Sequence, residues 1–318
     1  MNKEYSYDNI VLTPKYSEVR SRSNLDTSVE FLGKKFKSVA MPANMKCTID
    51  FTKAEELSEA GYFYVLHRFY DYDNIYNWVK NNQDLKTISI SIGVNEKDYE
   101  LVNDLFVNKL RVDYITIDVA HGHHILVKEM IEHIKNHNFK NDAKIIAGNI
   151  GTIYAARDLN SWGADAVKVG LSMGKSCTTY NCTGVGTPMF STVANLSYLD
   201  IPVIADGQIR EVGDVCKALV AGGNMVMIGS EFAKCEDSPA KTIKNQVRPS
   251  LKEFYGSASS TNKGHDGYVE GKTVYLEMRE ETYKQYLDRI NQGIQSCMSY
   301  AGVDNVDKLY LMEYAIYR

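Results

Sequence analysis

The stretch AKIIAGNIGTIYAARDLNSWGADAVKVGL, residues 143–171, decides the fold. Two short apolar runs, at 143–149 and 164–171, flank a segment with helical periodicity at 153–162. Parallel strands are buried on both faces and need a crossover connection, which is usually a helix. The stretch is therefore predicted to form two parallel strands joined by a helix.

The same pattern recurs along the chain and gives eight apolar runs. The other six lie at 38–44, 62–67, 87–94, 112–120, 202–207 and 225–229, with helical patterns between them at 52–60, 126–135 and 212–221 among others. Eight alternating strands and helices predict an α/β protein with one (β/α)8 TIM barrel domain over 1–318. The alternative is a doubly wound open sheet. It usually has fewer strands and a GxGxxG motif after the first, which this sequence lacks.

Composition excludes several classes of function. The 318 residues carry a net charge of -4, so the chain lacks the basic surface that nucleic-acid binding usually needs. No apolar stretch approaches the roughly 18 residues of a membrane span, and the N-terminus lacks the apolar segment of a signal peptide. We expect a cytoplasmic protein that binds neither nucleic acid nor membrane.

The carboxyl ends of the strands carry the active site in a barrel of this kind. The loop after the sixth strand, GKSCTTYNCTGVGTP at 174–188, holds Cys177 among glycines and hydroxyls, where a thiol is accessible and a candidate nucleophile. Asp206-Gly207 follows the seventh strand and Gly229-Ser230 the eighth. Barrels often bind phosphate there, so a phosphorylated ligand is expected.

The region after the eighth strand departs from the barrel pattern. Residues 247–276 are rich in Gly, Ser and Lys and predict a mobile flap. A last helix is predicted at about 282–300, followed by an apolar tail at 308–317.

Six motifs in this order resemble the IMP dehydrogenase and GMP reductase family over nearly the whole chain. They are GKSCTT at 174–179, TGVG at 183–186, IADG at 204–207, MIGS at 227–230, FYGSAS at 254–259 and EGK at 270–272. The reductase branch is the closer one. Dehydrogenases usually carry a CBS insertion between early strands and an Arg-Tyr pair in the flap, and this chain has neither.

The resemblance implies NADPH-dependent reductive deamination of GMP to IMP and ammonia, a step of purine nucleotide interconversion. It implies that Cys177 attacks C2 of the purine and forms a covalent thioimidate intermediate. Thr179 and the flap residue Glu270 would then deliver the proton that the leaving ammonia requires.

The resemblance also implies two binding sites, a cation and an assembly. It assigns the purine nucleotide to Asp206, Gly207, Gln208, Gly229, Ser230, Gly256, Ser257, Ala258 and Gly271. It assigns the cofactor to Ser21, Arg22, Arg68, Asp118, Val119, Ala120, Leu171, Ser172, Ser296 and Ser299. The implied monovalent cation, K+, would lie at Ser172, Gly174 and Cys177. The implied assembly is a homotetramer in which the segment from Ser296 to Ser299 reaches a neighbour's cofactor.

The sequence departs from the family pattern at three places. Ser172-Met173-Gly174 replaces the usual GPG before the cysteine, Gln208 replaces a glycine of the phosphate site, and Tyr180 replaces a basic residue. These departures leave three alternatives open: a reductase of a deoxy or modified purine nucleotide, an oxidoreductase like IMP dehydrogenase, and a non-catalytic nucleotide-binding homologue.

Overall fold

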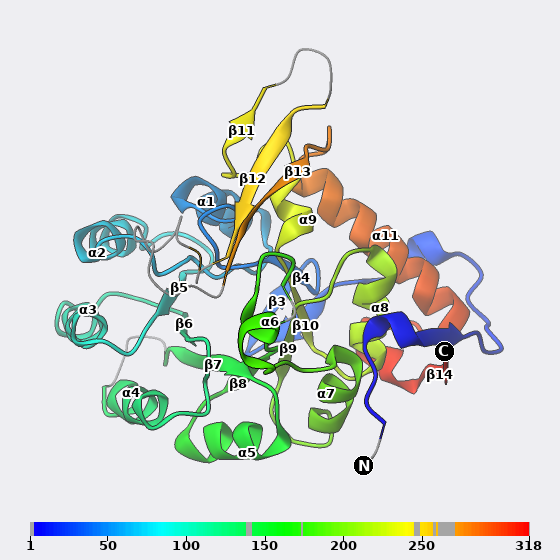
Figure 1. Cartoon of the computed structure of the whole chain (residues 1–318), viewed down its shortest axis with the longest axis horizontal. Coiled ribbons are helices and arrows are strands. Elements are labelled where there is room, and N and C mark those ends of the chain that lie inside the picture. Colours follow the sequence, from blue (N-terminus) through cyan, green and yellow to red (C-terminus); the bar gives the residue numbers. More distant parts are fainter. Residues whose placement is uncertain are drawn as a thin grey trace.

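The computed structural model describes residues 3–137, 142–172, 174–244, 249–256, 259 and 271–317. At its centre is a parallel sheet of seven strands in the order β4-β10-β9-β8-β7-β6-β5. The strands are β4 (Ala40–Pro42), β5 (Ser89–Ile92), β6 (Tyr114–Asp118), β7 (Lys144–Ile150), β8 (Ala166–Val169), β9 (Val203–Asp206) and β10 (Met225–Ile228). Figure 1 shows helices around this sheet, as expected for a (β/α)8 barrel.

The second predicted strand, at 62–67, differs in detail from the prediction. Residues 62–67 form only an isolated parallel bridge, from Leu66 to Ile90 of β5. The Leu66 N–H donates to the Ser89 carbonyl at 3.1 Å, and the Ser91 N–H donates to the Leu66 carbonyl at 3.0 Å. Phe63 and Tyr64 are fully buried, so packing as well as hydrogen bonding holds the segment beside β5.

Local signals explain where the barrel helices begin and end. Helix α5 (Ile153–Trp162) begins where Thr152 Oγ1 accepts from the Ala155 N–H and ends at Gly163, whose φ is +110°. The other barrel helices are α1 (Phe51–Ala60), α2 (Tyr72–Asn81), α3 (Glu96–Val107), α4 (Ile125–Lys135), α7 (Met189–Leu196) and α8 (Val212–Val220). Two short helices, α6 (Thr179–Thr183) and α9 (Ser230–Ala233), follow β8 and β10 at the carboxyl end of the sheet.

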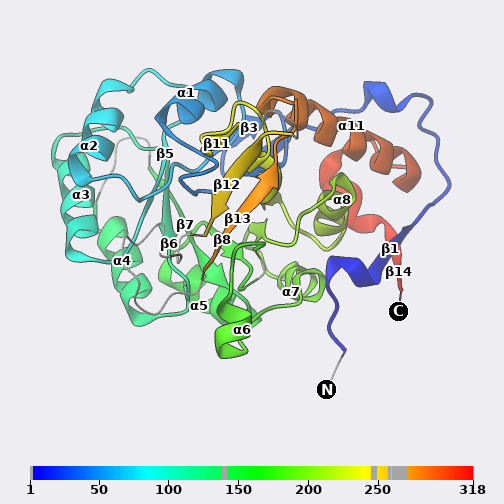
Figure 2. The same ribbon diagram turned by 45° about the horizontal axis from the view of Figure 1, so that its top comes forward.

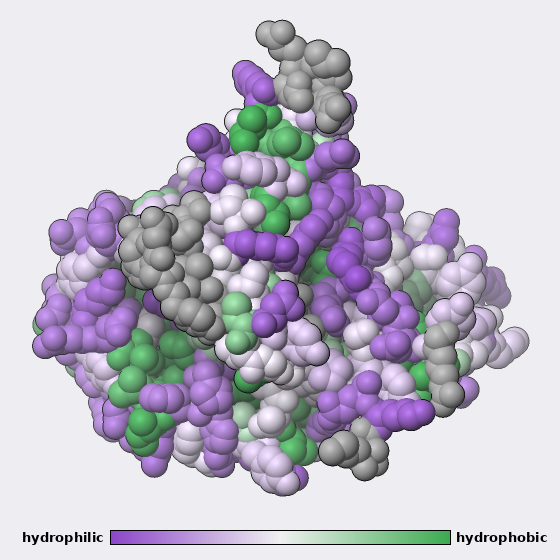
Figure 3. Space-filling view, viewed as in Figure 1, coloured by the Kyte–Doolittle hydropathy of each residue, from purple (hydrophilic) through white to green (hydrophobic). Residues whose placement is uncertain are grey.

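The predicted flap has ordered strands at both ends. Strands β11 (Thr242–Ile243), β12 (Leu251–Tyr255) and β13 (Thr273–Glu277) form an antiparallel sheet that projects from the barrel at the top of Figure 1. Alternating burial along β12 is typical of a strand with one covered face, a signal that the composition of 247–276 conceals. Hydrophilic side chains cover much of the face in Figure 3, whereas hydrophobic ones form patches on this projecting sheet and at the lower left of the view.

The two chain ends pair beside the barrel. Strand β1 (Ile10–Thr13) pairs antiparallel with β14 (Glu313–Ile316), near the long helix α11 (Tyr283–Ala301) in Figure 2. The remaining elements are η1 (Tyr7–Asn9), η2 (Arg22–Asn24), β2 (Val29–Phe31), β3 (Lys34–Phe36) and η3 (Val306–Leu311). Among the described residues, no helix combines the length and the apolar character needed to cross a bilayer.

Candidate active site

Four of the buried polar atoms that lack a hydrogen-bond partner lie where the barrel strands end. Within the described ranges, Asn44 Nδ2, Arg68 Nε, Asn149 Oδ1 and Gln208 Oε1 are buried without a hydrogen-bond partner. They follow or end four separate strand positions: β4, residues 62–67, β7 and β9. Leaving such atoms unpaired costs about 1–3 kcal/mol each, so a cluster of them marks a place where a ligand would complete the hydrogen bonding.

The loop after β8 presents Cys177 at this end of the sheet. The half-buried thiol donates to Thr179 Oγ1 across 3.3 Å, and the Cys177 N–H donates to the Gly174 carbonyl at 3.0 Å. The predicted nucleophile and the predicted hydroxyl relay are thus in direct contact. Glu270, the predicted proton donor, lies outside the described residues.

The base of the flap rests on the cysteine loop. Cys177 forms an antiparallel bridge with Gly271, and the Lys272 N–H donates to the Ser176 carbonyl at 2.9 Å. Gly256, at the end of β12, lies so close that a Cβ there would come within 3.1 Å of Ser176 Oγ. Two predicted nucleotide residues, Gly256 and Gly271, therefore adjoin the nucleophile loop. Ser257 and Ala258, predicted with them, lie outside the described residues.

Unusual backbone conformations occur where the chain leaves β8 and enters the Cys177 loop. Gly170 has a φ of +142°, and a Cβ on it would lie 1.9 Å from the Asp206 carbonyl oxygen, so only glycine fits between the ends of β8 and β9. Ser172 also has a positive φ, +66°, and its Oγ donates to the Val185 carbonyl at 2.6 Å. The Leu171 N–H donates a hydrogen bond to Thr187 Oγ1 at 3.0 Å.

A buried ionic network connects the strand ends. Lys168 Nζ lies 2.8 Å from Asp206 Oδ2 and 3.1 Å from Asp118 Oδ1, and its side chain is only 4% exposed. Burial alone would lower the pKa of Lys168, but Asp206 and Asp118 outweigh it and hold this pKa above its ordinary value. Asn149 Nδ2 donates to Asp206 Oδ2 at 2.9 Å, and Arg68 Nε lies 3.8 Å from Asp118 Oδ2.

Sequence reasoning assigned no role to Lys168 or to the Asn149 side chain. A signal existed for Lys168, because a lysine inside the four-residue buried strand 166–169 is unusual unless its charge is paired.

The predicted phosphate residues also meet at this end. Asp206 of β9 is paired in register with Met227 of β10, which makes the turns after these strands neighbours. Gly207 and Gln208 have φ values of +121° and +59°. After β10, Ser230 is buried and its Oγ donates to Glu231 Oε1 at 3.4 Å, while a Cβ on Gly229 would touch Phe254 at 3.4 Å.

Comparison with known proteins shows the family of the chain. A family model described as the IMP dehydrogenase / GMP reductase domain matches residues 4–315. The chain belongs to this family. It is 42% identical to the GMP reductase of Bacillus licheniformis, covering 99% of this chain and 97% of the relative. The GMP reductase of Mesoplasma florum is also 42% identical, with 98% and 97% covered. That of Acidovorax ebreus is 43% identical, with 98% and 95% covered.

Membership in the IMP dehydrogenase / GMP reductase family makes the chain an oxidoreductase, and the family implies a nicotinamide cofactor. The structure places the predicted cofactor residues in two separate regions. Arg68, Asp118, Val119 and Ala120 lie at the carboxyl end of the sheet, with Leu171 and Ser172 in the loop after β8. Arg22 instead donates to Ser296 Oγ at 3.2 Å, joining η2 to α11, and Ser299 lies one turn further along α11. In Figures 1 and 2, β6 and α11 stand on opposite sides of the molecule.

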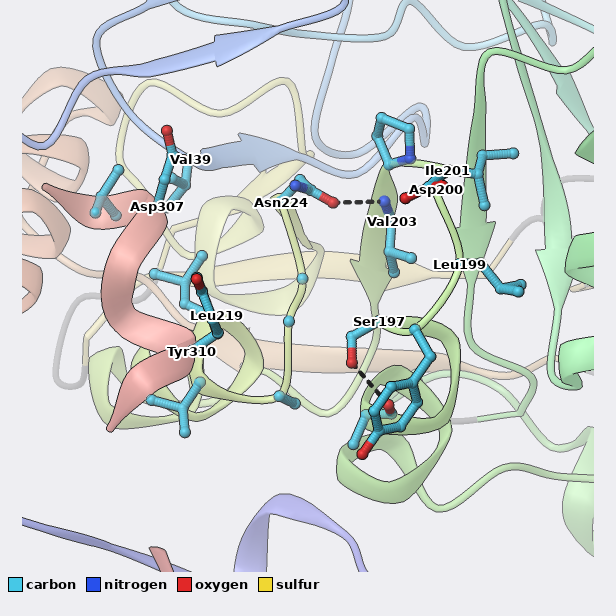
Figure 4. Close-up of a pocket in the computed structure, with 18 of the residues that line it drawn as sticks. Val39, Ser197, Leu199, Asp200, Ile201, Val203, Leu219, Asn224, Asp307 and Tyr310 are labelled. Atoms are coloured by element: carbon cyan, nitrogen blue, oxygen red, sulfur yellow. Dashed lines mark hydrogen bonds between the residues drawn. The ribbon is translucent and has the colours of Figure 1, made fainter. Parts of the chain in front are cut away.

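Two cavities lie away from Cys177. One of about 800 Å³ opens at the amino ends of β4, β9 and β10, where Figure 4 shows Asn224 Oδ1 accepting from the Val203 N–H at 2.8 Å. It is therefore at the opposite end of the strands from Asp206. The second, of about 570 Å³, is lined by Arg22 and Arg289 among others and adjoins the contact between Arg22 and Ser296.

Proposed function

We propose that the protein is a GMP reductase, which converts GMP to IMP and ammonia at the expense of NADPH. The observation that carries this proposal is the contact of Cys177 Sγ with Thr179 Oγ1, beside Gly271 at the base of the flap. The Cys177 thiol supplies the nucleophile for deamination. The Thr179 hydroxyl and Glu270, which precedes Gly271 in the sequence, supply the proton relay.

The reaction balances as GMP, NADPH and two protons giving IMP, NADP+ and ammonium. The Cys177 thiolate forms a bond to C2 of the purine, and the bond from C2 to the exocyclic nitrogen then breaks. Thr179 passes a proton from Glu270 to the departing nitrogen. Bound NADPH supplies the hydride that C2 then receives. Breaking the bond between carbon and sulfur releases IMP and restores the thiolate.

The nucleotide would lie across the turns after β9 and β10. Asp206 accepts from the ribose hydroxyls, and Gly207, Gln208, Gly229 and Ser230 bind the phosphate, where backbone N–H groups favour an anion. Gly256, Ser257, Ala258 and Gly271 border the base beside Cys177. The unpaired Gln208 Oε1 and Asn149 Oδ1 support a ligand with several hydrogen-bond donors.

The cofactor would extend from Cys177 toward Arg68. The buried Nε of Arg68, which has no hydrogen-bond partner, fits a hydroxyl or phosphate oxygen, and Asp118 adds an acceptor for ribose. Because β6 and α11 stand on opposite sides, we assign Ser21, Arg22, Ser296 and Ser299 to the cofactor of a neighbouring subunit in a homotetramer. Light scattering after size-exclusion chromatography tests the assembly, and a monomer at assay concentration would contradict it.

We place K+ in the turn that contains Ser172, Gly174 and Cys177, and we place the protein in the cytoplasm. Replacing K+ by choline is expected to slow turnover of GMP. An unchanged rate in choline would remove the cation from the mechanism.

The direct test is a panel of GMP, dGMP and IMP assayed with NADPH, NADH and their oxidised forms. GMP with NADPH should give the highest kcat/KM, and Cys177→Ala should abolish it. Cys182→Ala is the matched control, because Cys182 is an exposed thiol in the same loop. Wild-type protein that binds GMP but never oxidises NADPH would overturn the proposal. A higher kcat/KM for dGMP would move the activity to a deoxynucleotide.

A further inference from the structure

The register of the parallel sheet determines which residues lie beside Lys168. In the register of the sheet, Asp118 of β6 is opposite Gly148 of β7, and Gly148 is opposite Lys168 of β8. The three residues therefore form one row across three strands. Lys168 is also opposite Ile204 of β9, two residues before Asp206, and residues two apart on a strand point to the same face. Lys168 thus shares a face with both carboxylates.

Gly148 opens the path from Lys168 to Asp118. A Cβ on Gly148 would lie 2.6 Å from Lys168 Cβ and 2.5 Å from the Lys168 carbonyl oxygen. Any larger residue there would collide with β8 and would fill the space between Lys168 and Asp118. The absence of a side chain lets one ammonium on β8 reach across β7 and bind a carboxylate on β6 at 3.1 Å.

The charges alternate along the network. Arg68, Asp118, Lys168 and Asp206 follow one another as cation, anion, cation and anion, with separations of 3.8, 3.1 and 2.8 Å. Under the proposed function, the two ends of this charge network contact different ligands. Arg68 and Asp118 face the cofactor, and Asp206 faces the nucleotide. Among the residues that the structure describes, only Lys168 has a charged group in direct contact with both acids, and its side chain is buried.

We propose that Lys168 is a positioning residue that holds Asp118 and Asp206 in place together and thereby aligns the cofactor with the nucleotide. This inference rests on the proposed function. Lys168 binds one oxygen of each carboxylate and thereby fixes the oxygens that are left to accept from ribose hydroxyls. Without it, the two acids would have no cation between them, and their side chains would no longer be held in one arrangement.

The first experiment compares Lys168→Met with Lys168→Arg by calorimetric binding of GMP alone and of NADP+ alone. Removing one partner of a buried ion pair is strongly unfavourable. Lys168→Met should therefore lower the affinity for each ligand by at least about tenfold. Lys168→Arg keeps the cation and should restore most of both affinities. Wild-type affinities in Lys168→Met would overturn the inference.

The second experiment separates positioning from charge balance. The double variant Lys168→Met/Asp118→Asn removes one cation and one anion, so it should recover much of the thermal stability that Lys168→Met loses. Its affinity for GMP should stay low, because Asp206 still lacks Lys168. Recovery of both stability and GMP affinity in the double variant would mean that Lys168 serves only to neutralise charge.

Lys252→Met is the matched control. Lys252 is also buried, but its Nζ donates to the backbone carbonyls of Glu236, Ser238 and Ala240. Its loss should lower the Tm and leave both ligand affinities within about twofold, because Lys252 Nζ binds backbone carbonyls rather than Asp118 or Asp206. Wild-type protein that neither binds nor reduces GMP would overturn the proposed function. Wild-type turnover with unchanged affinities in Lys168→Met would overturn the positioning role alone.

Discussion

Thr179 supplies the hydroxyl that contacts the Cys177 thiol. Its Oγ1 accepts from the thiol at 3.3 Å, and it is the first residue of α6. One hydroxyl at this position can hold the thiol in the unreacted state and deliver a proton after attack. The substitution of this single oxygen therefore tests the relay without altering the loop.

We predict that Thr179→Val lowers kcat for GMP by about 10²–10⁴-fold, the usual contribution of general acid catalysis. Valine keeps the shape of threonine but cannot carry a proton. Thr179→Ser keeps the hydroxyl and should retain most of the rate. Steady-state kinetics with NADPH measures both variants, and a wild-type kcat in Thr179→Val would remove Thr179 from the relay.

His67 shows how burial sets a titration at the residue scale. It is 2% exposed, its Nδ1 accepts from the Phe69 N–H at 3.1 Å, and its ring stacks on Tyr70. Burial, with a contribution from the positive charge of Lys46, lowers the pKa of His67 from 6.5 to about 3. Between pH 6.5 and about 3, the folded state thus holds the His67 ring neutral, whereas the ring is protonated in the unfolded chain.

We predict that acid destabilises the protein through His67. Its contribution to the free energy of unfolding is fully present above pH 6.5, the unfolded value, and is lost as the pH falls toward about 3. The slope contributed by one proton is at most about 1.4 kcal/mol per pH unit. His67→Asn keeps an acceptor for Phe69 and should flatten the decline that urea unfolding measures between about pH 7 and 5. An equally steep decline in His67→Asn would assign the proton to another group.

At the scale of elements, β7 and β8 pack more closely at Gly148 and Lys168 than the hydrophobic patterns of the two strands predict. The sequence predicted both strands and the helix between them, and the capping residues Thr152 and Gly163 mark the bounds of α5. The need for glycine at 148 follows only from how closely Lys168 approaches it. Strands β12 and β13 were missed, because the flexible composition of 247–276 hides their alternation.

We predict that Gly148→Ala destabilises the protein by about 1–3 kcal/mol, because the added methyl overpacks the sheet. Gly213→Ala is the control. Gly213 lies in α8, and a Cβ there would meet nothing within 4 Å, so alanine should be neutral or stabilise by up to about 1 kcal/mol. Chemical unfolding compares the two variants. Equal stability of Gly148→Ala and wild type would show that β7 and β8 can separate freely.

At the scale of the whole molecule, the predicted cofactor residues fall into two regions. One surrounds Arg68 and Asp118 at the carboxyl end of the sheet, and the other joins Arg22 to Ser296 on α11. No sequence pattern distinguishes these regions. Under the proposed function, their separation requires a second subunit to complete the cofactor site.

We predict that Arg22→Ala raises the KM for NADPH by about tenfold, the loss expected for one charge-assisted contact with a phosphate. The KM for NADH should change much less, since NADH lacks the 2′-phosphate. GMP affinity should stay at the wild-type value, because Arg22 lies away from Asp206. An equal rise in KM for both cofactors would place Arg22 outside the phosphate site.

Local information in the chain was enough for the barrel class, the bounds of α1, α4, α5, α8 and α11 to within one residue, the loop that carries Cys177 and the family to which the chain belongs. Periodicity, caps and ordered motifs act over a few residues, so they can be read along the sequence. The tertiary structure alone decided that Lys168 binds both Asp118 and Asp206, that Gly148 clears the way, and that Arg22 meets Ser296. These contacts join residues far apart in the chain, and they depend on strand register and packing distance rather than on residue type.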